Sequence, residues 1–281
     1  MEVYNTVQSL LKRRSSIPQE NSIGLVPTMG ALHKGHLSLV TKAKNENDLV
    51  VATIFVNPTQ FDRKEDLDNY PSSLEDDLKM LEEVGCDIAF VPVAKEIYAD
   101  TIESEKFDFD GLDLMMEGQF RKGHFDGVAT IVKKLFIITK PSRAYFGKKD
   151  FQQLQIIKKM VDAENLPVEI VPCEIFREDD GLAMSSRNRR LEPKRRAEAP
   201  LIFKTLQNSK VMLEAGESFE QIHQMALKEF SESPYLDLEY FEIAEKDTLR
   251  KENAFDATKK YIAFVAAYAG DIRLIDNIEL N

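Results

Sequence analysis

The sequence has few cysteines, no excess of positive charge and no long hydrophobic run. Cys86 and Cys173 are its two cysteines and lack metal-type spacing, so we interpret them as small buried hydrophobic residues in a reducing compartment. The longest apolar run, residues 261–269, is far shorter than the roughly 20 residues that a membrane-spanning helix needs. Acidic residues outnumber basic ones by 48 to 37, a net charge of −11. This balance argues against a general nucleic-acid binder, which needs positive surface to neutralise phosphates.

The amino-terminal stretch has no unbroken apolar segment of the kind that a signal peptide needs. Lys12, Arg13 and Arg14 interrupt its apolar positions, so we expect a cytoplasmic protein with no membrane partner. The chain has 281 residues, 43% of them apolar and 30% charged. That profile is typical of a soluble globular protein with two domains or one enlarged domain.

Both glycine-rich fingerprints of nucleotide binding are missing. The sequence contains neither G-x-G-x-x-G nor G-x-x-x-x-G-K-[ST], the patterns of dinucleotide and P-loop sites. This absence disfavours a dinucleotide-dependent oxidoreductase. A nucleotide, if one is bound, must be held in another way.

The order of local patterns predicts an α/β protein. Strand-like runs alternate with periodic apolar stretches through the first two thirds of the chain, which favours a Rossmann-like parallel sheet with helices on both faces. The expected strands are 23–26, 49–57, 88–91, 143–146 and 168–175, and the expected helices between them are 37–44, 74–84, 128–138 and 154–161.

The order of helix-like and strand-like segments changes after Arg177. Helix-like stretches at 193–215 and 219–230 are followed by strand candidates at 238–243 and 261–268. We therefore expect a boundary near residues 176–188. The first domain would be residues 1–176, and residues 177–281 would form a smaller α+β domain.

The start of the 74–84 helix has an unusual charge pattern. Ser72 followed by Glu75 has the spacing of a capping box. On the helical wheel Asp77 falls beside the apolar stripe, whereas Asp76 points away. A carboxylate is thus expected at the edge of packed surface, where a charge is costly.

The most informative segment is residues 27–36, PTMGALHKGH. It leaves a predicted strand, turns at Gly30 and places His33 and His36 three residues apart at a predicted helix start, so both imidazoles can point at one ligand. A helix N-terminus attracts anions and disfavours imidazolium, leaving neutral donors for phosphate oxygens. We interpret the segment as a phosphate site, with two ordinary surface histidines as the alternative.

Four further polar segments follow predicted strands or the predicted boundary. Residues 146–153, FGKKDFQQ, offer a lysine for phosphate and a glutamine for a small polar substrate, although a solvated loop has the same pattern. Residues 180–188, DGLAMSSRN, offer hydroxyls and a guanidinium that can wrap a polyphosphate. Segments 57–61 and 117–125 add polar groups where this architecture places its pocket.

Together, the five segments resemble the pantothenate synthetase (pantoate:beta-alanine ligase) family, within the nucleotidyltransferases that carry an H-x-G-H signature. The resemblance runs over residues 23–190. It implies ATP-dependent condensation of pantoate with β-alanine to pantothenate, through a pantoyl adenylate, with release of AMP and pyrophosphate. It also implies Mg²⁺ as cofactor, a homodimer, and a carboxy-terminal domain that covers the ATP site.

The resemblance assigns roles to individual residues. Those implied in catalysis are His36, His33, Lys149 and Arg187. Those implied in ATP binding are Met29, Gly30, Ala31, Leu32, His33, Lys34, Gly35, His36, Gly147, Lys148, Lys149, Asp150, Phe176, Met184, Ser185, Ser186 and Arg187. Those implied in holding pantoate are Gln60 and Gln153, with Asn57, Arg121 and His124 as weaker candidates. The implied magnesium ligand is Asp76, with Asp77 as its neighbour, and the choice between the two stays open.

Two departures and two alternatives accompany the resemblance. Thr59 stands where some members carry methionine, and Lys148 beside Lys149 makes the phosphate lysine ambiguous. The nearest alternative is another H-x-G-H adenylyltransferase, which would release its adenylated product. The other is a nucleotide-sensing binding protein without turnover.

Overall fold

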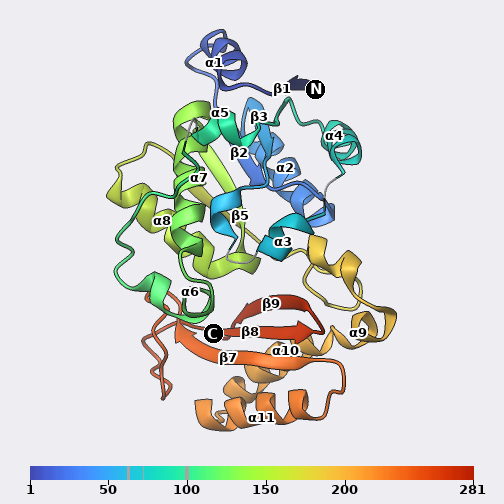
Figure 1. Ribbon diagram of the computed structural model, residues 1–281. Coiled ribbons are helices and arrows are strands. Elements are labelled where there is room, and N and C mark those ends of the chain that lie inside the picture. Colours follow the sequence, from blue (N-terminus) through green and yellow to red (C-terminus); the bar gives the residue numbers. More distant parts are fainter. Residues whose placement is uncertain (62–63, 72, 99–100) are drawn as a thin grey trace. The chain divides into compact units, whose positions relative to one another are not determined.

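Figure 1 shows the computed structural model, which describes residues 1–61, 64–71, 73–98 and 101–281. The chain forms two compact units. The first comprises Met1–Lys148 and Gln152–Glu174, and the second comprises Lys149–Phe151 and Ile175–Asn281. Among the described residues, no helix combines the length and the apolar character needed to cross a membrane.

The first unit is built on a six-stranded parallel sheet with the order β1-β4-β3-β2-β5-β6. From β2 the chain winds outward through β3 to β4, and later returns to place β5 on the other side of β2. That reversal makes the carboxyl ends of β2 and β5 the switch point, where such sheets bind ligands. The strands are β1 Glu2–Tyr4, β2 Ile23–Thr28, β3 Leu49–Ile54, β4 Ile88–Phe90, β5 Arg143–Gly147 and β6 Glu169–Cys173.

Helices cover both faces of this sheet. On one face Leu39 and Val40 of α2 and Leu81 of α4 pack against strand residues that include Val50 and Ala52. Successive strand residues face opposite sides, so the buried Val51 points to the other face, where α7 lies in Figure 1. The helices are α1 Val7–Ser15, α2 Lys34–Glu46, α3 Lys64–Asp68, α4 Leu74–Glu83, α5 Ala94–Tyr98, α6 Met116–Phe120, α7 His124–Thr139 and α8 Phe151–Ala163, with 3₁₀ turns η1 Pro58–Gln60, η2 Leu112–Leu114 and η3 Lys148–Asp150.

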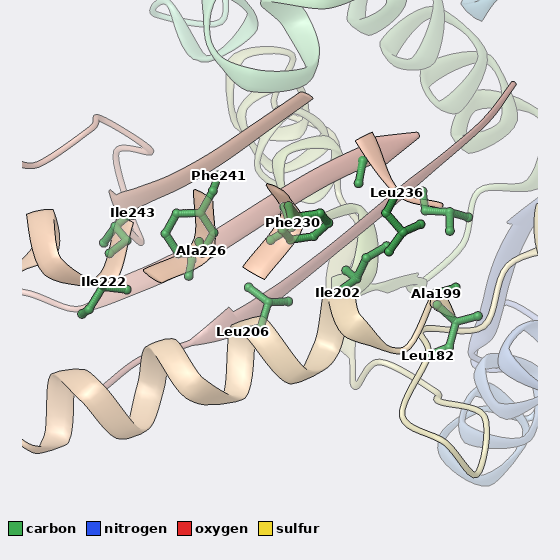
Figure 2. Close-up of a cluster of buried hydrophobic side chains, with 14 of the residues drawn as sticks. Leu182, Ala199, Ile202, Leu206, Ile222, Ala226, Phe230, Leu236, Phe241 and Ile243 are labelled. Carbon is green, nitrogen blue, oxygen red and sulfur yellow. The ribbon is translucent and has the colours of Figure 1, made fainter. Parts of the chain in front are cut away.

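The second unit packs helices against a three-stranded antiparallel sheet, β7-β8-β9. Figure 2 shows its core, in which Leu206 of α10 and Ile222 and Phe230 of α11 pack with Phe241 of β7. A capping box of Ser218 and Gln221 starts α11. The elements are η4 Ser186–Arg190, α9 Pro193–Glu198, α10 Leu201–Glu214, α11 Phe219–Ser231, β7 Asp237–Glu245, β8 Tyr261–Ala269 and β9 Ile272–Glu279.

The predicted fold class, a Rossmann-like parallel sheet with helices plus a small α+β part, is confirmed. Two segment predictions are wrong. The strand expected over 49–57 ends at Ile54, and the helix expected over 193–215 is broken into α9 and α10. Pro200 lies at that break, and a proline has no N–H to continue the helical ladder.

The sequence patterns also missed β1 and β9, which lie at sheet edges. The predicted capping residue Ser72 lies outside the described residues. Ser73 takes the N-cap position of α4, and its hydroxyl bonds the carboxylate of Asp76 instead of a backbone amide.

Candidate active site

The turn that joins β2 to α2 carries the predicted phosphate site, and a buried carboxylate supports it. Gly30 (φ 83°) and Ala31 (φ 49°) both adopt the left-handed conformation, which a residue with a side chain rarely takes. Asp77 of α4, 1% exposed, accepts hydrogen bonds from Ala31 N (2.9 Å) and Leu32 N (2.7 Å). Both carboxylate oxygens therefore bind the backbone of the turn.

The two histidines meet at the start of α2. His33 is the N-cap residue, His36 lies in the first turn, and their half-buried rings stack with centroids 4.0 Å apart. Two positive charges at this separation would repel each other, which disfavours protonation of both rings at once. Of their neighbours, Lys34 is exposed and Gly35 is half-buried.

The segment after β3 forms a hydrogen-bonded cluster around Asn57, which is 1% exposed. Its amide donates to Gly127 O (3.1 Å) and to Gln60 Oε1 (3.2 Å), and its Oδ1 accepts from Tyr98 (2.6 Å). Gln60 in turn donates to the sulfur of Met29 at the end of β2. Asn57 thus positions Gln60, and Tyr98, which sequence reasoning missed, positions Asn57.

His124 at the start of α7 supports the same turn. Its Nδ1 lies 2.7 Å from Gln60 O and its Nε2 lies 3.0 Å from a guanidinium nitrogen of Arg121. A carbonyl only accepts and a guanidinium only donates, so the proton is assigned to Nδ1 of a neutral ring. Gly127 permits the close approach, because a Cβ there would lie 2.3 Å from Thr59 O. Among the weaker pantoate candidates, His124 thus already holds the backbone of Gln60.

The adjacent glutamines of α8 have different environments. Gln152 is 3% exposed, and its amide binds Glu117 N, Leu112 O and Met115 O at 2.6–3.0 Å. It therefore fastens the segment that leads into α6. Gln153 is half-buried and makes no side-chain hydrogen bond to any residue that the structure describes. Of the two, Gln153 has the amide available for a substrate.

Asp76 and Asp77 differ in the same way. Asp77 is engaged by the turn after β2, whereas Asp76 is exposed in the first turn of α4 and bonded to Ser73. Within the described residues, no group of three or more His, Cys, Asp or Glu side chains could hold a metal by itself. Of the two carboxylates, Asp76 is the one exposed to solvent.

β5 ends at Gly147 beside the switch point, and Lys148 follows as the first residue of η3. Lys148 forms an ion pair with Glu174, with Nζ 2.6 Å from Oε1. The lysine that follows it, Lys149, belongs to the second unit. The two lysines thus differ in environment, because Lys148 pairs with Glu174 at 2.6 Å whereas Lys149 lies 3.7 Å from Asp150.

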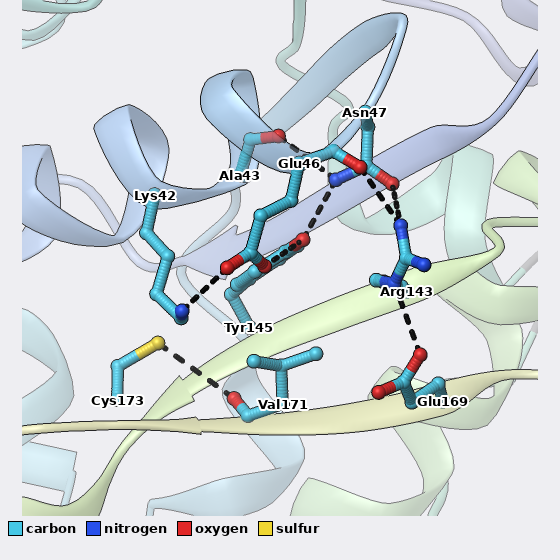
Figure 3. Close-up of polar contacts among 9 residues, drawn as sticks. All are labelled: Lys42, Ala43, Glu46, Asn47, Arg143, Tyr145, Glu169, Val171 and Cys173. Carbon is cyan, nitrogen blue, oxygen red and sulfur yellow. Dashed lines mark hydrogen bonds and ion pairs between the residues drawn. The ribbon is translucent and has the colours of Figure 1, made fainter.

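A polar network fixes α2 against β5 (Figure 3). The hydroxyl of Tyr145 donates to Glu46 (2.9 Å) and accepts from Asn47 (2.7 Å), while Arg143 donates to Glu46 O (2.8 Å). Burial raises the pKa of Tyr145 to about 12, so the phenol stays protonated. The network joins the helix that carries the histidines to the neighbouring strand.

Both cysteines are free and buried, as the sequence predicted. Burial raises the pKa of Cys86 and of Cys173 to about 11. The thiolate is the nucleophilic form, so neither thiol is a suitable nucleophile near neutral pH.

In the second unit, Lys149 and Asp150 belong to the 3₁₀ turn η3. The side chain of Lys149 is 19% exposed, and its ammonium lies 3.7 Å from the Asp150 carboxylate. The carbonyl of Lys149 accepts a 2.9 Å hydrogen bond from the amide of Asn277 on β9. Asn277 was not among the residues predicted from the sequence.

The remaining ATP candidates lie on or directly after a hairpin of the second unit. Met184 N donates to Phe176 O (2.9 Å), and Phe176 itself is 38% exposed. Ser185 caps η4 by accepting from Arg187 N (3.3 Å), and Ser186 is 5% exposed. The backbone turn thus gathers Ser185, Ser186 and Arg187 into one short segment.

Comparisons with known proteins agree along the whole chain. A family model described as pantoate-beta-alanine ligase matches residues 2–279. Pantothenate synthetase from Christiangramia forsetii is 52% identical, with 100% of each chain covered, and that from Flavobacterium psychrophilum is 46% identical, with 94% of each covered.

Two solved structures share the fold. Pantothenate synthetase from Thermus thermophilus has a TM-score of 0.93 and 39% identity, covering 100% of this chain and 99% of that one. Pantoate-beta-alanine ligase from Francisella tularensis, complexed with beta-gamma ATP and beta-alanine, has a TM-score of 0.84 and 34% identity, covering 100% and 98%. The ligase class and the family predicted from the sequence are confirmed, and this chain belongs to the pantoate-beta-alanine ligase family.

Proposed function

We propose that this chain condenses pantoate with β-alanine at the expense of ATP, through an enzyme-bound pantoyl adenylate, and releases AMP and pyrophosphate. The observation that carries the proposal is the H-x-G-H turn at the switch point, where Asp77 holds the backbone and His33 stacks on His36. A helix start with two imidazole donors suits the phosphates of a nucleotide. The ATP and beta-alanine bound to the Francisella relative support the choice of substrates.

In the first step, a pantoate carboxylate oxygen attacks the α-phosphorus of ATP as the bond to the bridging oxygen of pyrophosphate breaks. No protein nucleophile is needed, because the substrate carboxylate forms the new bond. The protein has to position the reactants and stabilise the charge that develops on the phosphate oxygens. We assign the stabilisation of this charge to four residues: His33 and His36 of the first unit, and Lys149 and Arg187 of the second.

Other residues would contact the nucleotide through backbone or side-chain groups. In the first unit these are Met29, Gly30, Ala31, Leu32, Lys34, Gly35, Gly147 and Lys148. In the second they are Asp150, Phe176, Met184, Ser185 and Ser186. The half-buried, hydroxyl-rich segment around Ser185 supports this assignment, since hydroxyls and amide N–H groups are donors for phosphate.

Pantoate is assigned to Gln60 and Gln153. The network of Asn57 and His124 fixes the main chain and side chain of Gln60, and Arg121 lies 3.0 Å from the ring of His124. A substrate hydroxyl or carboxylate would therefore meet an amide whose position is set in advance. Such preorganisation lowers the entropy cost of aligning the carboxylate for attack.

Magnesium fits the residues present. Mg²⁺ commonly binds one or two carboxylates together with substrate phosphates and water, and Asp76 is an exposed carboxylate of that kind. Asp77 would support the turn, not the metal. When bound, the ion would neutralise phosphate charge, which helps pyrophosphate to leave.

In the second step, the neutral amine of β-alanine attacks the acyl carbon of the adenylate and AMP leaves with the bonding electrons of the broken C–O bond. The amine loses a proton as the amide forms. The main contribution of the protein to the rate of this step is to align the amine with the acyl carbon. We also propose a cytoplasmic homodimer, which the family resemblance supports.

Isotope exchange tests the proposal directly. The enzyme is incubated with ATP, Mg²⁺, pantoate and labelled pyrophosphate, without β-alanine. We expect label to enter ATP only when pantoate is present, because adenylation is reversible until the amine arrives. Absence of exchange with folded protein would contradict the proposal and favour a binding protein without turnover.

A further inference from the structure

Two neighbouring residues of β9, Asp276 and Asn277, interrupt the expected pattern of an edge strand. Successive strand residues normally alternate between the two faces of a sheet, yet both are buried, at 3% and 4% exposure. Burial of an aspartate and an asparagine stabilises a fold poorly unless both are well bonded. Their partners are therefore informative.

Asn277 binds the segment that carries the phosphate lysine. Its amide nitrogen Nδ2 donates to Lys149 O at 2.9 Å, and its backbone N–H donates to Asp276 Oδ1 at 2.8 Å. Lys149 lies in a 3₁₀ turn of three residues. The direction of its side chain depends on how that turn is held.

Asp276 binds the hairpin that leads to Ser185 and Arg187. Its two carboxylate oxygens accept from the two terminal nitrogens of Arg177 at 2.6 and 3.1 Å, a bidentate pair. Arg177 also donates to Gly181 O at 3.1 Å, and its guanidinium stacks 3.6 Å above the ring of Phe203. The isolated bridge between Arg177 and Ala183 closes the hairpin.

The two neighbours thus hold two segments that are far apart in sequence, both of which carry residues assigned to ATP. From this we infer that Asp276 and Asn277 are positioning residues for nucleotide binding, Asn277 through the Lys149 backbone and Asp276 through Arg177 and its hairpin. Neither side chain need touch the nucleotide. The inference rests on the proposed role of Lys149 in binding ATP.

The test measures the dissociation constant for ATP by calorimetric titration in the presence of Mg²⁺. Asn277→Ala removes the donor to Lys149 O, and we expect the constant to rise about three- to tenfold, the effect of one neutral hydrogen bond. Asn281→Ala is the matched control, because Asn281 Nδ2 also donates to a backbone carbonyl, that of Lys259, at 2.9 Å. Its ATP dissociation constant should equal that of the wild type.

A double-mutant cycle separates positioning from general loss of structure. If Asn277 acts through the lysine, Asn277→Ala should change ATP affinity less than about twofold in a Lys149→Ala background. Equal fold-changes in both backgrounds would overturn the inference, as would unchanged affinity in the single variant. Asn277→Leu, which fills similar space without a donor, replaces the alanine variant if that protein does not fold.

A second comparison tests Asp276 against another ion pair. Asp276→Asn should weaken ATP binding, whereas Glu239→Gln, which breaks the Arg273 pair (2.6 Å) between β7 and β9, should not. Equal effects of the two variants would overturn the role of Asp276. Pyrophosphate exchange by the wild type is read separately: its failure with normal ATP binding contradicts the proposed reaction alone, and absence of ATP binding by the wild type contradicts both.

Discussion

The two units hold their functional segments by different means. In the first unit, side chains bind one another or the backbone of a neighbouring loop. Asn57 donates to the side chain of Gln60, His124 binds the Gln60 carbonyl, and Asp77 binds the backbone of the turn after β2. In the second unit one strand, β9, holds two separate segments through Asn277 and Asp276. The first arrangement lies at the switch point of a parallel sheet. The second depends on β9, a strand of the antiparallel sheet.

The comparison teaches where preorganisation comes from. A parallel sheet gathers the loops that follow its strands, so short hydrogen bonds between neighbouring loops are enough to fix a site. An antiparallel sheet offers no such edge, and a functional segment beside it needs dedicated anchors. In the second unit, Asp276 and Asn277 supply these anchors.

The largest effect is expected at His36. Replacing it with alanine removes a preorganised donor to the phosphates, which typically lowers a rate about 10²- to 10³-fold. Single-turnover formation of pantoyl adenylate measures this effect. His223→Ala is the matched control, since His223 of α11 packs against Phe241 in the second unit, with ring centroids 6.0 Å apart.

The control variant should form adenylate at the wild-type rate, and both variants should keep the wild-type circular dichroism spectrum. Adenylate formation by His36→Ala at the wild-type rate would remove His36 from catalysis. The proposed phosphate ligands would then be His33, Lys149 and Arg187.

The next largest effect is expected at Asp77, the support of the turn after β2. Asp77→Asn replaces one acceptor oxygen with a donor that faces a backbone N–H, and the loss of a charge-assisted hydrogen bond should lower the free energy of unfolding by about 2–3 kcal/mol. Urea denaturation measures the change. Asp76→Asn should leave that free energy within about 0.5 kcal/mol of the wild type, because Asp76 is exposed.

When the Mg²⁺ dependence of activity is measured, the larger effect is expected from Asp76→Asn. Asp76→Asn should raise the Mg²⁺ concentration that gives half-maximal pyrophosphate exchange, whereas the folded fraction of Asp77→Asn should keep the wild-type Mg²⁺ dependence. The reverse pattern would make Asp77 the metal ligand. It would contradict the assignment of Asp77 as the support of the turn and Asp76 as the ligand.

Most of the fold could be predicted from local patterns because its strands and helices have clear periodicity. The exceptions are elements whose pattern is weak. β1 has three residues, and β9 reads Ile-Arg-Leu-Ile-Asp-Asn-Ile-Glu, in which alternation fails at Asp276 and Asn277. That failure marks the two residues as unusual, although their partners, Arg177 and Lys149, are about 100 residues or more away in the chain.

Within the site, sequence reasoning identified residue types more easily than partners. The helical wheel marked Asp77 as anomalous, but a wheel contains no information about the turn after β2, which is 45 and 46 residues away. Tyr98 gave no signal at all, because a tyrosine on an apolar helix face has many structural roles. Adjacent pairs of like residues were ambiguous for the same reason, since burial and hydrogen bonding, not sequence, distinguish their members.

The smallest effect is expected at such a pair, Gln152 and Gln153. Gln153→Ala should raise the KM for pantoate about tenfold through loss of a hydrogen bond or two, with the KM for ATP unchanged. Gln152→Ala should lower the free energy of unfolding by about 1–2 kcal/mol, because it leaves buried partners unsatisfied, and should leave both KM values near the wild type. Initial rates at varied pantoate and at varied ATP, together with urea denaturation, separate these outcomes. A shift in the ATP KM of Gln153→Ala equal to its shift in the pantoate KM would mean that the start of α8 responds as a unit, and pantoate binding could then not be assigned to that one amide.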